Sequence, residues 1–190
     1  MIELYLTRHG ETLENAQHIL QGHMPGHLSP LGLEQARQLR DSLAHTRFDH
    51  IIVSDLQRAV DTAQIVNEPH GLPLVTTPLL RERDWGEFTG VYIRDVQAHL
   101  VSDFPSSVEN AAQLSQRARQ FLQFLLDSYN GQTVLAVGHG YFDRCIVAEV
   151  ENKLPHDVPR WGNAEVRHIR LYSPEDNLGQ VTDDTEVSAD

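Results

Sequence analysis

The chain has 190 residues, of which 40% are hydrophobic and 22% are charged, proportions typical of one globular domain with a substantial core. Its formal net charge of −12 argues against general nucleic-acid binding, which requires a basic surface. Every Lys or Arg residue except Lys153 is an arginine, the side chain suited to bidentate contacts with phosphate or carboxylate, and the single cysteine, Cys145, excludes an intrachain disulfide and a cysteine-rich zinc site.

A buried strand over residues 2–6 is the first predicted element, and a polar loop over residues 18–27 follows it. Three histidines in this loop raise the question of a metal site. A proline and a glycine between His23 and His27 keep these two side chains from sharing one helix face, and the loop contains no carboxylate. We therefore expect no metal here and place His23 at the rim of a pocket.

Ser29 as N-cap and Pro30 at the first helical position predict a helix that runs to about Ala44. The remaining elements, in chain order, are a strand over 48–53, a helix over 56–66, a strand over 72–75, an irregular stretch over 80–90, helices over 92–100 and 108–129, a strand over 133–137, a helix over 141–150 and a strand over 166–172. Strands that alternate with helices predict an α/β fold. We expect a three-layer sandwich with helices on both faces of a mostly parallel central sheet.

The pattern predicts a single domain over residues 1–172, with a small helical cap-like segment over about 83–120. The acidic tail, residues 173–190, is expected to be disordered. We find no targeting segment and no apolar run near the roughly 18 residues that span a membrane. The expectation is a cytoplasmic protein without a membrane partner.

Four polar features follow predicted strands or lie in the loops beside them: Arg8-His9, Arg58, Glu82 and His139. An α/β sheet brings strand ends to one edge, where ligands bind. A neutral imidazole can attack phosphorus and form a phosphohistidine, while the arginines and the second histidine, if it is protonated, would neutralise the non-bridging oxygens. Glu82 could supply a proton to the departing alkoxide if its surroundings favour the neutral carboxyl. Such a site needs no metal or other cofactor, because the positive side chains supply the electrostatic stabilisation.

At these positions the chain resembles the histidine phosphatase superfamily, also called phosphoglycerate-mutase-like. The motifs that carry the resemblance occur in order along the chain: Arg8-His9-Gly10-Glu11-Thr12 with Asn15, Gln21-Gly22, Leu28-Ser29-Pro30-Leu31-Gly32, Ser54-Asp55-Leu56 with Arg58-Ala59, Glu82 with Gly86 and Gly90, Gly138-His139-Gly140, and Asn163. The Arg-x-Pro that usually follows Arg-His-Gly in the acid-phosphatase and phytase branch is absent. The chain therefore resembles the other, mostly intracellular branch.

The resemblance implies a role for each matching residue. His9 would accept the phosphoryl group, and Glu82 would act first as the general acid and then as the base that activates water. The phosphate and the rest of the substrate would be bound by Arg8, Arg58 and His139 with help from Asn15, Gln21, Gly22 and Gly140.

Both a phosphatase and a mutase fit these roles. A mutase needs further cationic groups for a second anionic substituent, and the family's mutases carry a longer basic insertion between the positions of Glu82 and His139. Here that segment contains no lysine, and its arginines are Arg83, Arg94, Arg117 and Arg119, of which the last two are expected to be solvated on the long helix. The sequence favours a phosphatase that acts on a small phosphate monoester, with a mutase as the alternative.

Other interpretations stay open for several residues. A non-catalytic phospholigand-binding protein is a third hypothesis, which the presence of His9, Glu82 and His139 disfavours. Asp143 and Arg144 could line the site or form a structural ion pair. The fallback acids are Asp84 and Glu87, and the expected substrate pocket contains His23, Arg83, Trp85 and Tyr92, although Trp85, Phe88 and Tyr92 fit a core position equally well.

Overall fold

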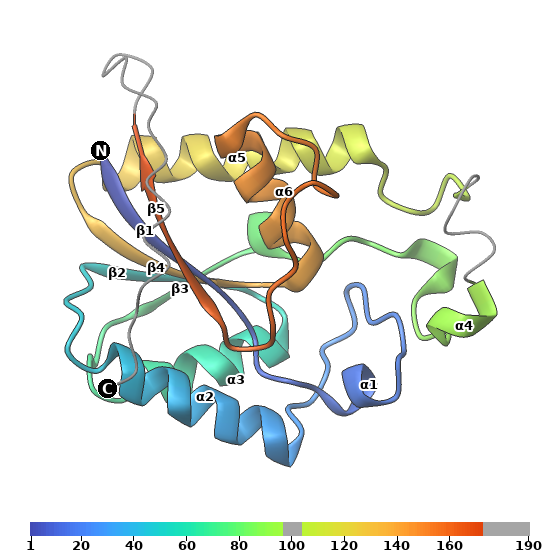
Figure 1. Cartoon of the computed structure of the whole chain (residues 1–190), viewed down its shortest axis with the longest axis horizontal. Helices are drawn as coiled ribbons and strands as arrows, with labels where there is room; N and C mark the ends of the chain where they lie inside the picture. Colours follow the sequence, from blue (N-terminus) through green and yellow to red (C-terminus); the bar gives the residue numbers. More distant parts are fainter. Residues whose placement is uncertain (97–103, 173–190) are drawn as a thin grey trace.

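The computed structural model describes residues 1–96 and 104–172. A five-stranded sheet in the order β3-β2-β4-β1-β5 forms the middle layer (Figure 1). Three of its four strand pairs are parallel, and only β5 runs antiparallel, beside β1. The strands are β1 (Ile2–Arg8), β2 (His50–Ser54), β3 (Leu74–Thr77), β4 (Thr133–Gly138) and β5 (Val166–Leu171). The prediction of a mostly parallel α/β sheet is confirmed.

Helices cover both faces of this sheet. The helices α2 (Pro30–Leu43) and α3 (Gln57–Val66) lie on one face, and α5 (Ala111–Tyr129) and α6 (Gly140–Glu151) lie on the other (Figure 1). Each face has its own apolar cluster, one containing Leu39 and Ala63 and the other containing Phe121 and Ile146. Burial of two separate helix layers against one sheet is what a three-layer sandwich requires.

Strand register brings the polar strand ends together. Arg8 at the end of β1 lies opposite Gly138 at the end of β4, and Val53 near the end of β2 lies opposite Val137. The backbone N–H of His9 continues the ladder by donating to the Gly138 carbonyl at 3.1 Å. The segments that follow these three strands therefore start at one edge of the sheet.

The predicted boundaries of the long helix and of the third strand are wrong by a few residues for local reasons. The long helix begins at Ala111 instead of residue 108, because Asn110 and Gln113 form a capping box at that point. The third strand is β3 at Leu74–Thr77 instead of residues 72–75. The N–H and C=O of Leu72 are already bonded to the Asn67 side chain, so this residue cannot join the strand ladder.

Short elements complete the described part of the chain. The helices α1 (Leu13–Ala16) and α4 (Ile93–Val96) lie at one end of the molecule, to the right in Figure 1, and an isolated bridge between Ile19 and Tyr92 joins the segments beside them. The 3₁₀ turn η1 (Pro78–Leu80) ends where the predicted irregular stretch begins, and a second, η2 (Gly86–Phe88), lies within that stretch. The C-terminal part of the predicted helix over 92–100 and the predicted acidic tail over 173–190 lie outside the described residues.

No helix among residues 1–96 and 104–172 is both long and apolar enough to cross a lipid bilayer.

Candidate active site

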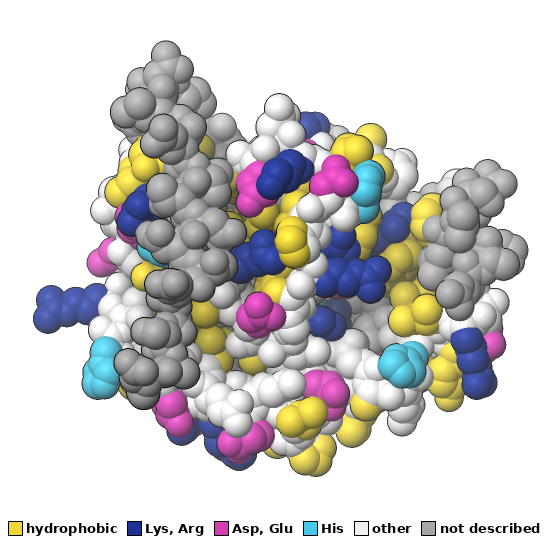
Figure 2. Space-filling view, in the orientation of Figure 1, with side chains coloured by type: hydrophobic (Ala, Val, Ile, Leu, Met, Phe, Trp, Pro, Cys, Tyr) yellow, Lys and Arg dark blue, Asp and Glu magenta, His cyan; other side chains and the backbone are white. Residues whose placement is uncertain are grey.

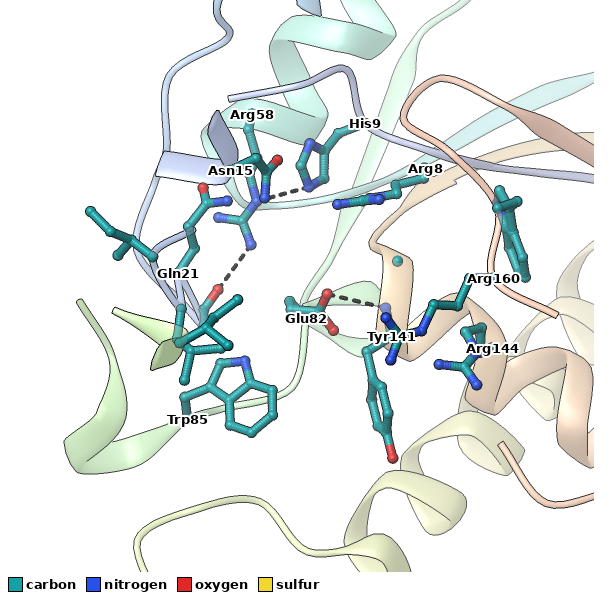
Figure 3. Close-up of a pocket in the computed structure, with 16 residues that line it drawn as sticks. Arg8, His9, Asn15, Gln21, Arg58, Glu82, Trp85, Tyr141, Arg144 and Arg160 are labelled. Carbon is teal, nitrogen blue, oxygen red and sulfur yellow. Dashed lines mark hydrogen bonds between the residues drawn. The ribbon is translucent and has the colours of Figure 1, made fainter. Parts of the chain in front are cut away.

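A cavity of about 270 Å³ opens at the edge where the strands end (Figure 3). It lies between the segment after β1, the beginning of α3, the Glu82–Trp85 segment, the beginning of α6 and the loop before β5. The residues that line it are Arg8, His9, Asn15, Ile19, Leu20, Gln21, Gly22, Arg58, Glu82, Trp85, Ile93, Gly140, Tyr141, Arg144, Arg160 and Trp161. Most of the predicted site residues are thus brought to one cavity.

His9 is 2% exposed and is held in one tautomer. Its Nδ1 lies 2.6 Å from the carbonyl oxygen of Gly10, and since a carbonyl only accepts, Nδ1 carries the hydrogen. Its Nε2 then accepts from Nε of Arg58 at 3.2 Å. Burial, followed by the charges of Arg58 and Arg8, holds the pKa of His9 well below its usual value. The imidazole is therefore neutral, with the Nε2 lone pair directed toward the guanidinium.

Arg58 lies in the first turn of α3, where the helix dipole disfavours a cation. Carbonyl oxygens of the preceding loop offset this cost, because the guanidinium donates to Gly22, at 2.9 Å, and to Met24 and Pro25 (Figure 3). Burial lowers the pKa of Arg58 to about 10, which leaves it charged at neutral pH. The positive charge next to His9 Nε2 is thus built into the resting site.

His139 lies behind His9 rather than in the cavity wall. It is fully buried, its ring centroid is 5.1 Å from that of His9, and its Nε2 lies 2.8 Å from the Ser54 hydroxyl oxygen. Burial, with the nearby Arg58 charge, holds the pKa of His139 well below its usual value. The second histidine would neutralise phosphate oxygens only if protonated, and its lowered pKa favours the neutral ring, so the positive charge of the resting site comes from the arginines.

Two buried nitrogen atoms near His9 have no hydrogen-bond partner among the described residues: Nε of Arg8 and Nδ1 of His139. A buried polar atom without a partner is costly and usually marks a place where a ligand or water completes the bonding. Arg8 is half-buried, and a Cβ added at Gly140 would lie 2.9 Å from its Nε. Glycine at position 140 therefore keeps space for this guanidinium.

Asp143 neither lines the cavity nor belongs to a described ion pair, which settles the alternatives left open by the sequence. Its Oδ1 accepts from the backbone N–H of His139 at 3.0 Å, and its Oδ2 has no partner among the described residues. Burial raises the pKa of Asp143 well above its usual value, which favours the neutral carboxyl. A Cβ at Gly138 would lie 2.2 Å from Oδ1, so glycine at position 138 provides the space for Asp143.

Glu82 is the one carboxylate in the lining of this cavity. Its Oε1 accepts from the backbone N–H groups of Arg83, at 2.8 Å, and Phe142, at 3.1 Å, and its Oε2 accepts from Tyr141 at 3.2 Å (Figure 3). Two of these donors belong to the first turn of α6, so the helix end fixes the carboxyl group toward the cavity.

The fallback acids are engaged elsewhere. Oδ1 of Asp84 accepts from the N–H of Gly86, and Oε2 of Glu87 accepts from the Ser107 hydroxyl. Neither carboxylate lines the cavity.

Arg117 supports the Glu82 segment, and the expectation that it is solvated is wrong. Its side chain is 15% exposed, pairs with Glu109 at 2.7 Å and donates to the carbonyl oxygens of Leu79, Arg81 and Glu82. Arg119, two residues further along α5, is 61% exposed, as expected of a solvated residue, and pairs with Glu149.

Three residues expected in the pocket do not line this cavity. Arg83 is 6% exposed and stacks on the rings of Trp85 and Phe104 while its Nε donates to the Glu109 carbonyl. His23 donates to the Glu82 carbonyl at 2.9 Å and faces Asp84. Tyr92 is 42% exposed beside the cavity.

The lining also contains residues that the sequence did not indicate: Tyr141, Arg160, Trp161 and the apolar Ile19, Leu20 and Ile93. Arg144, left undecided above, is among the lining residues too. The Arg160-Trp161 pair lies in an irregular loop, where no periodicity predicts which way a side chain points. Asn163, further along this loop, donates to the His9 carbonyl at 3.0 Å and so ties the loop to the site.

Among residues 1–96 and 104–172, no group of three or more His, Cys, Asp or Glu side chains is placed to hold a metal ion.

Comparison with known proteins places the chain among phosphatases and phosphoglycerate mutase-like proteins. The family model described as histidine phosphatase superfamily (branch 1) matches residues 4–184. The chain is 31% identical over 149 residues to adenosylcobalamin/alpha-ribazole phosphatase of Escherichia coli (strain K12), with 73% of each chain covered. It is 30% identical over 184 residues to phosphoglycerate mutase-like protein 4 of Arabidopsis thaliana, covering 90% of this chain and 80% of that one. Among solved structures, Bacillus stearothermophilus YhfR aligns with a TM-score of 0.86 and 27% identity, covering 100% of this chain and 98% of that one.

Proposed function

Because the chain belongs to branch 1 of the histidine phosphatase superfamily, we propose that it is a phosphatase that hydrolyses a small phosphate monoester through a phosphohistidine at His9. The observation that carries this proposal is the neutral His9 ring, whose Nε2 accepts from Arg58 at 3.2 Å beside the unpartnered Nε of Arg8. A phosphoryl group placed against Nε2 would meet both guanidinium groups, which are suited to its charge.

In the first step, Nε2 of His9 attacks phosphorus while the bond from phosphorus to the ester oxygen breaks. The Nδ1–H bond to the Gly10 carbonyl keeps the lone pair on Nε2 and stabilises the positive charge that the ring acquires. Arg8 and Arg58 stabilise the charge on the non-bridging oxygens, and the Glu82 carboxyl group transfers a proton to the departing alkoxide.

In the second step, water attacks the phosphohistidine and the phosphorus–nitrogen bond breaks. The Glu82 carboxylate, positioned by the first turn of α6, takes a proton from the water as the new bond forms. Inorganic phosphate leaves, Glu82 is again protonated and the Nε2 lone pair of His9 is restored. The cycle consumes one water molecule per ester and uses no metal ion or other cofactor.

The test is inorganic phosphate release from a panel of small monoesters in the presence of a chelator, with His9→Ala as the comparison. We expect release by the wild type that survives chelation and is lost in His9→Ala. A radiolabelled ester should transfer its phosphoryl group to the wild-type protein in an acid-labile, base-stable linkage. Release that continues in His9→Ala would refute the proposal.

Mutase activity is the alternative, which the likeness to phosphoglycerate mutase-like protein 4 supports. A mutase returns the phosphoryl group to the substrate instead of to water. Interconversion of 2- and 3-phosphoglycerate without phosphate release from any ester would establish it.

A further inference from the structure

The cavity carries more positive charge than one phosphate group needs. Its lining contains four arginines and one carboxylate, Glu82. Arg8 and Arg58 flank His9, whereas Arg144 and Arg160 lie further along the cavity, next to Tyr141 (Figure 3). Figure 2 shows Lys and Arg side chains around the hollow in the middle of this face.

Arg144 is fixed in place by the fold. It lies in the second turn of α6 and is 8% exposed, and its Nε donates to the Val158 carbonyl at 3.0 Å. Its two terminal nitrogens have no acceptor among the described residues. A guanidinium that is anchored through Nε and open at its other edge presents two parallel N–H donors, the arrangement that binds carboxylate or phosphate in bidentate fashion.

Arg160 lies in the loop before β5 and is exposed. No carboxylate of the described residues lies within ion-pair distance of Arg144 or Arg160, although the two guanidinium groups are close enough for Arg160 to contribute to the lowered pKa of Arg144, after burial. Two neighbouring cations without a carboxylate partner repel each other, and an anion bound between them would offset this repulsion.

Resting on the phosphatase function proposed above, we propose that Arg144 and Arg160 form a second anion site for a carboxylate or phosphate at the end of the substrate remote from the scissile phosphate. The substrate is then a small organic phosphate with two anionic groups. A cavity of about 270 Å³ is at the small end of ligand sites, which suits a metabolite of a few carbon atoms rather than a phosphorylated protein segment.

The experiment compares esters that differ only in the second anion. Glycerol 3-phosphate and 3-phosphoglycerate share one carbon skeleton, and the second has a carboxylate in place of a hydroxymethyl group. Glucose 6-phosphate and glucose 1,6-bisphosphate form a pair in which the added anion is a phosphate. For at least one pair we expect the wild type to show kcat/KM at least about tenfold higher for the ester with two anions, since a charged hydrogen-bonded contact contributes at least this factor.

Arg160→Gln is the main variant, because the exposed Arg160 side chain has no hydrogen bond or ion pair among the described residues that folding would lose. We expect it to lower the preference to within about threefold of equality, and Arg144→Gln to do the same. Arg119→Gln removes one charge from an exposed ion pair on α5 and is the control that should keep the wild-type preference. The pair of esters that responds identifies the anion as carboxylate or phosphate.

A binding measurement on an inactive variant tests the second anion site independently of the proposed phosphatase activity. Calorimetry on His9→Ala should show at least about tenfold tighter binding of the ester with two anions for the same pair, and the added Arg160→Gln should abolish this difference. If no ester is hydrolysed but this binding difference is found, the phosphatase fails and the second anion site stands. If esters are hydrolysed but Arg160→Gln leaves every preference unchanged, the second anion site is refuted and the phosphatase stands.

Discussion

Substitution of Glu82 by glutamine tests whether this residue transfers a proton or only supports the beginning of α6. The two roles predict different results because the proposed acid acts on the leaving group. An alkoxide leaves with difficulty unless it is protonated, whereas 4-nitrophenolate leaves without a proton. The ratio of the two rates therefore reports proton transfer alone.

The contacts of Glu82 determine how much activity each of the two roles would lose in Glu82→Gln. All three donors to the Glu82 carboxylate are backbone N–H groups, with Arg83 and Phe142 on Oε1 and Tyr141 on Oε2. A glutamine NH₂ group on the Oε2 side would face the Tyr141 N–H and lose one hydrogen bond, about 1 kcal/mol or roughly fivefold, with either ester. Loss of a general acid costs a further factor of roughly 10² to 10⁴ with the alkyl ester only.

The assay is kcat/KM for glycerol 3-phosphate and for 4-nitrophenyl phosphate, in the wild type and in Glu82→Gln. We expect at least about a hundredfold greater loss with the alkyl ester. Asp84→Asn is the matched control, since Asp84 lies two residues away, accepts from Gly86 through one oxygen and does not line the cavity. Equal losses with both esters in Glu82→Gln would show that Glu82 only positions α6 and would refute the proton-transfer role.

Two further predictions follow from buried groups. Because the pKa values of His9 and His139 are depressed, lowering the pH from 7.5 to 5.5 should leave both rings neutral. Nitrogen NMR of labelled histidines, with the signals assigned from His9→Gln and His139→Gln, should show chemical shifts of the neutral ring throughout this range. Protonation of either ring near pH 6.5 would contradict this prediction. Gly138→Ala should destabilise the protein by about 1 to 3 kcal/mol, because its Cβ would lie 2.2 Å from Oδ1 of the buried Asp143. Asp143→Ala should relieve this clash. A double-mutant cycle of unfolding free energies measured in urea should therefore show strong coupling between Gly138→Ala and Asp143→Ala, and additive effects of the two substitutions would count against the predicted clash.

Much of the fold was predictable because its signals are local. Ser29 and Pro30 begin α2 through bonds within one helical turn, and the apolar runs of β1 and β4 are long enough to indicate buried strands. His9 and His139 follow these strands directly, so the sheet topology alone brings them together. The errors at β3 and α5 arose from side chains of Asn67 and Asn110 that bond to the backbone, which apolar periodicity does not register.

The cavity wall was less predictable because it depends on contacts between distant segments. Nothing local distinguishes Arg117, which supports the Glu82 segment, from the exposed Arg119 on the same helix. Arg160 is a single arginine in an irregular loop, and its place in the cavity follows from how that loop packs against α6, where the Val158 carbonyl accepts from Arg144. A sequence pattern gives the type of such a side chain but not its partner.

The distribution of charge links the cavity to substrate choice. The lining contributes four arginines and one glutamate, a formal charge of +3, so with a total of −12 the rest of the chain carries −15. At long range the protein repels an anionic ester, but at physiological ionic strength charges are screened beyond about 8 Å. Attraction therefore acts only once the ester reaches the arginines. If the proposed second anion site exists, selection among phosphate esters would then depend on how many anionic groups contact the guanidinium groups at the same time.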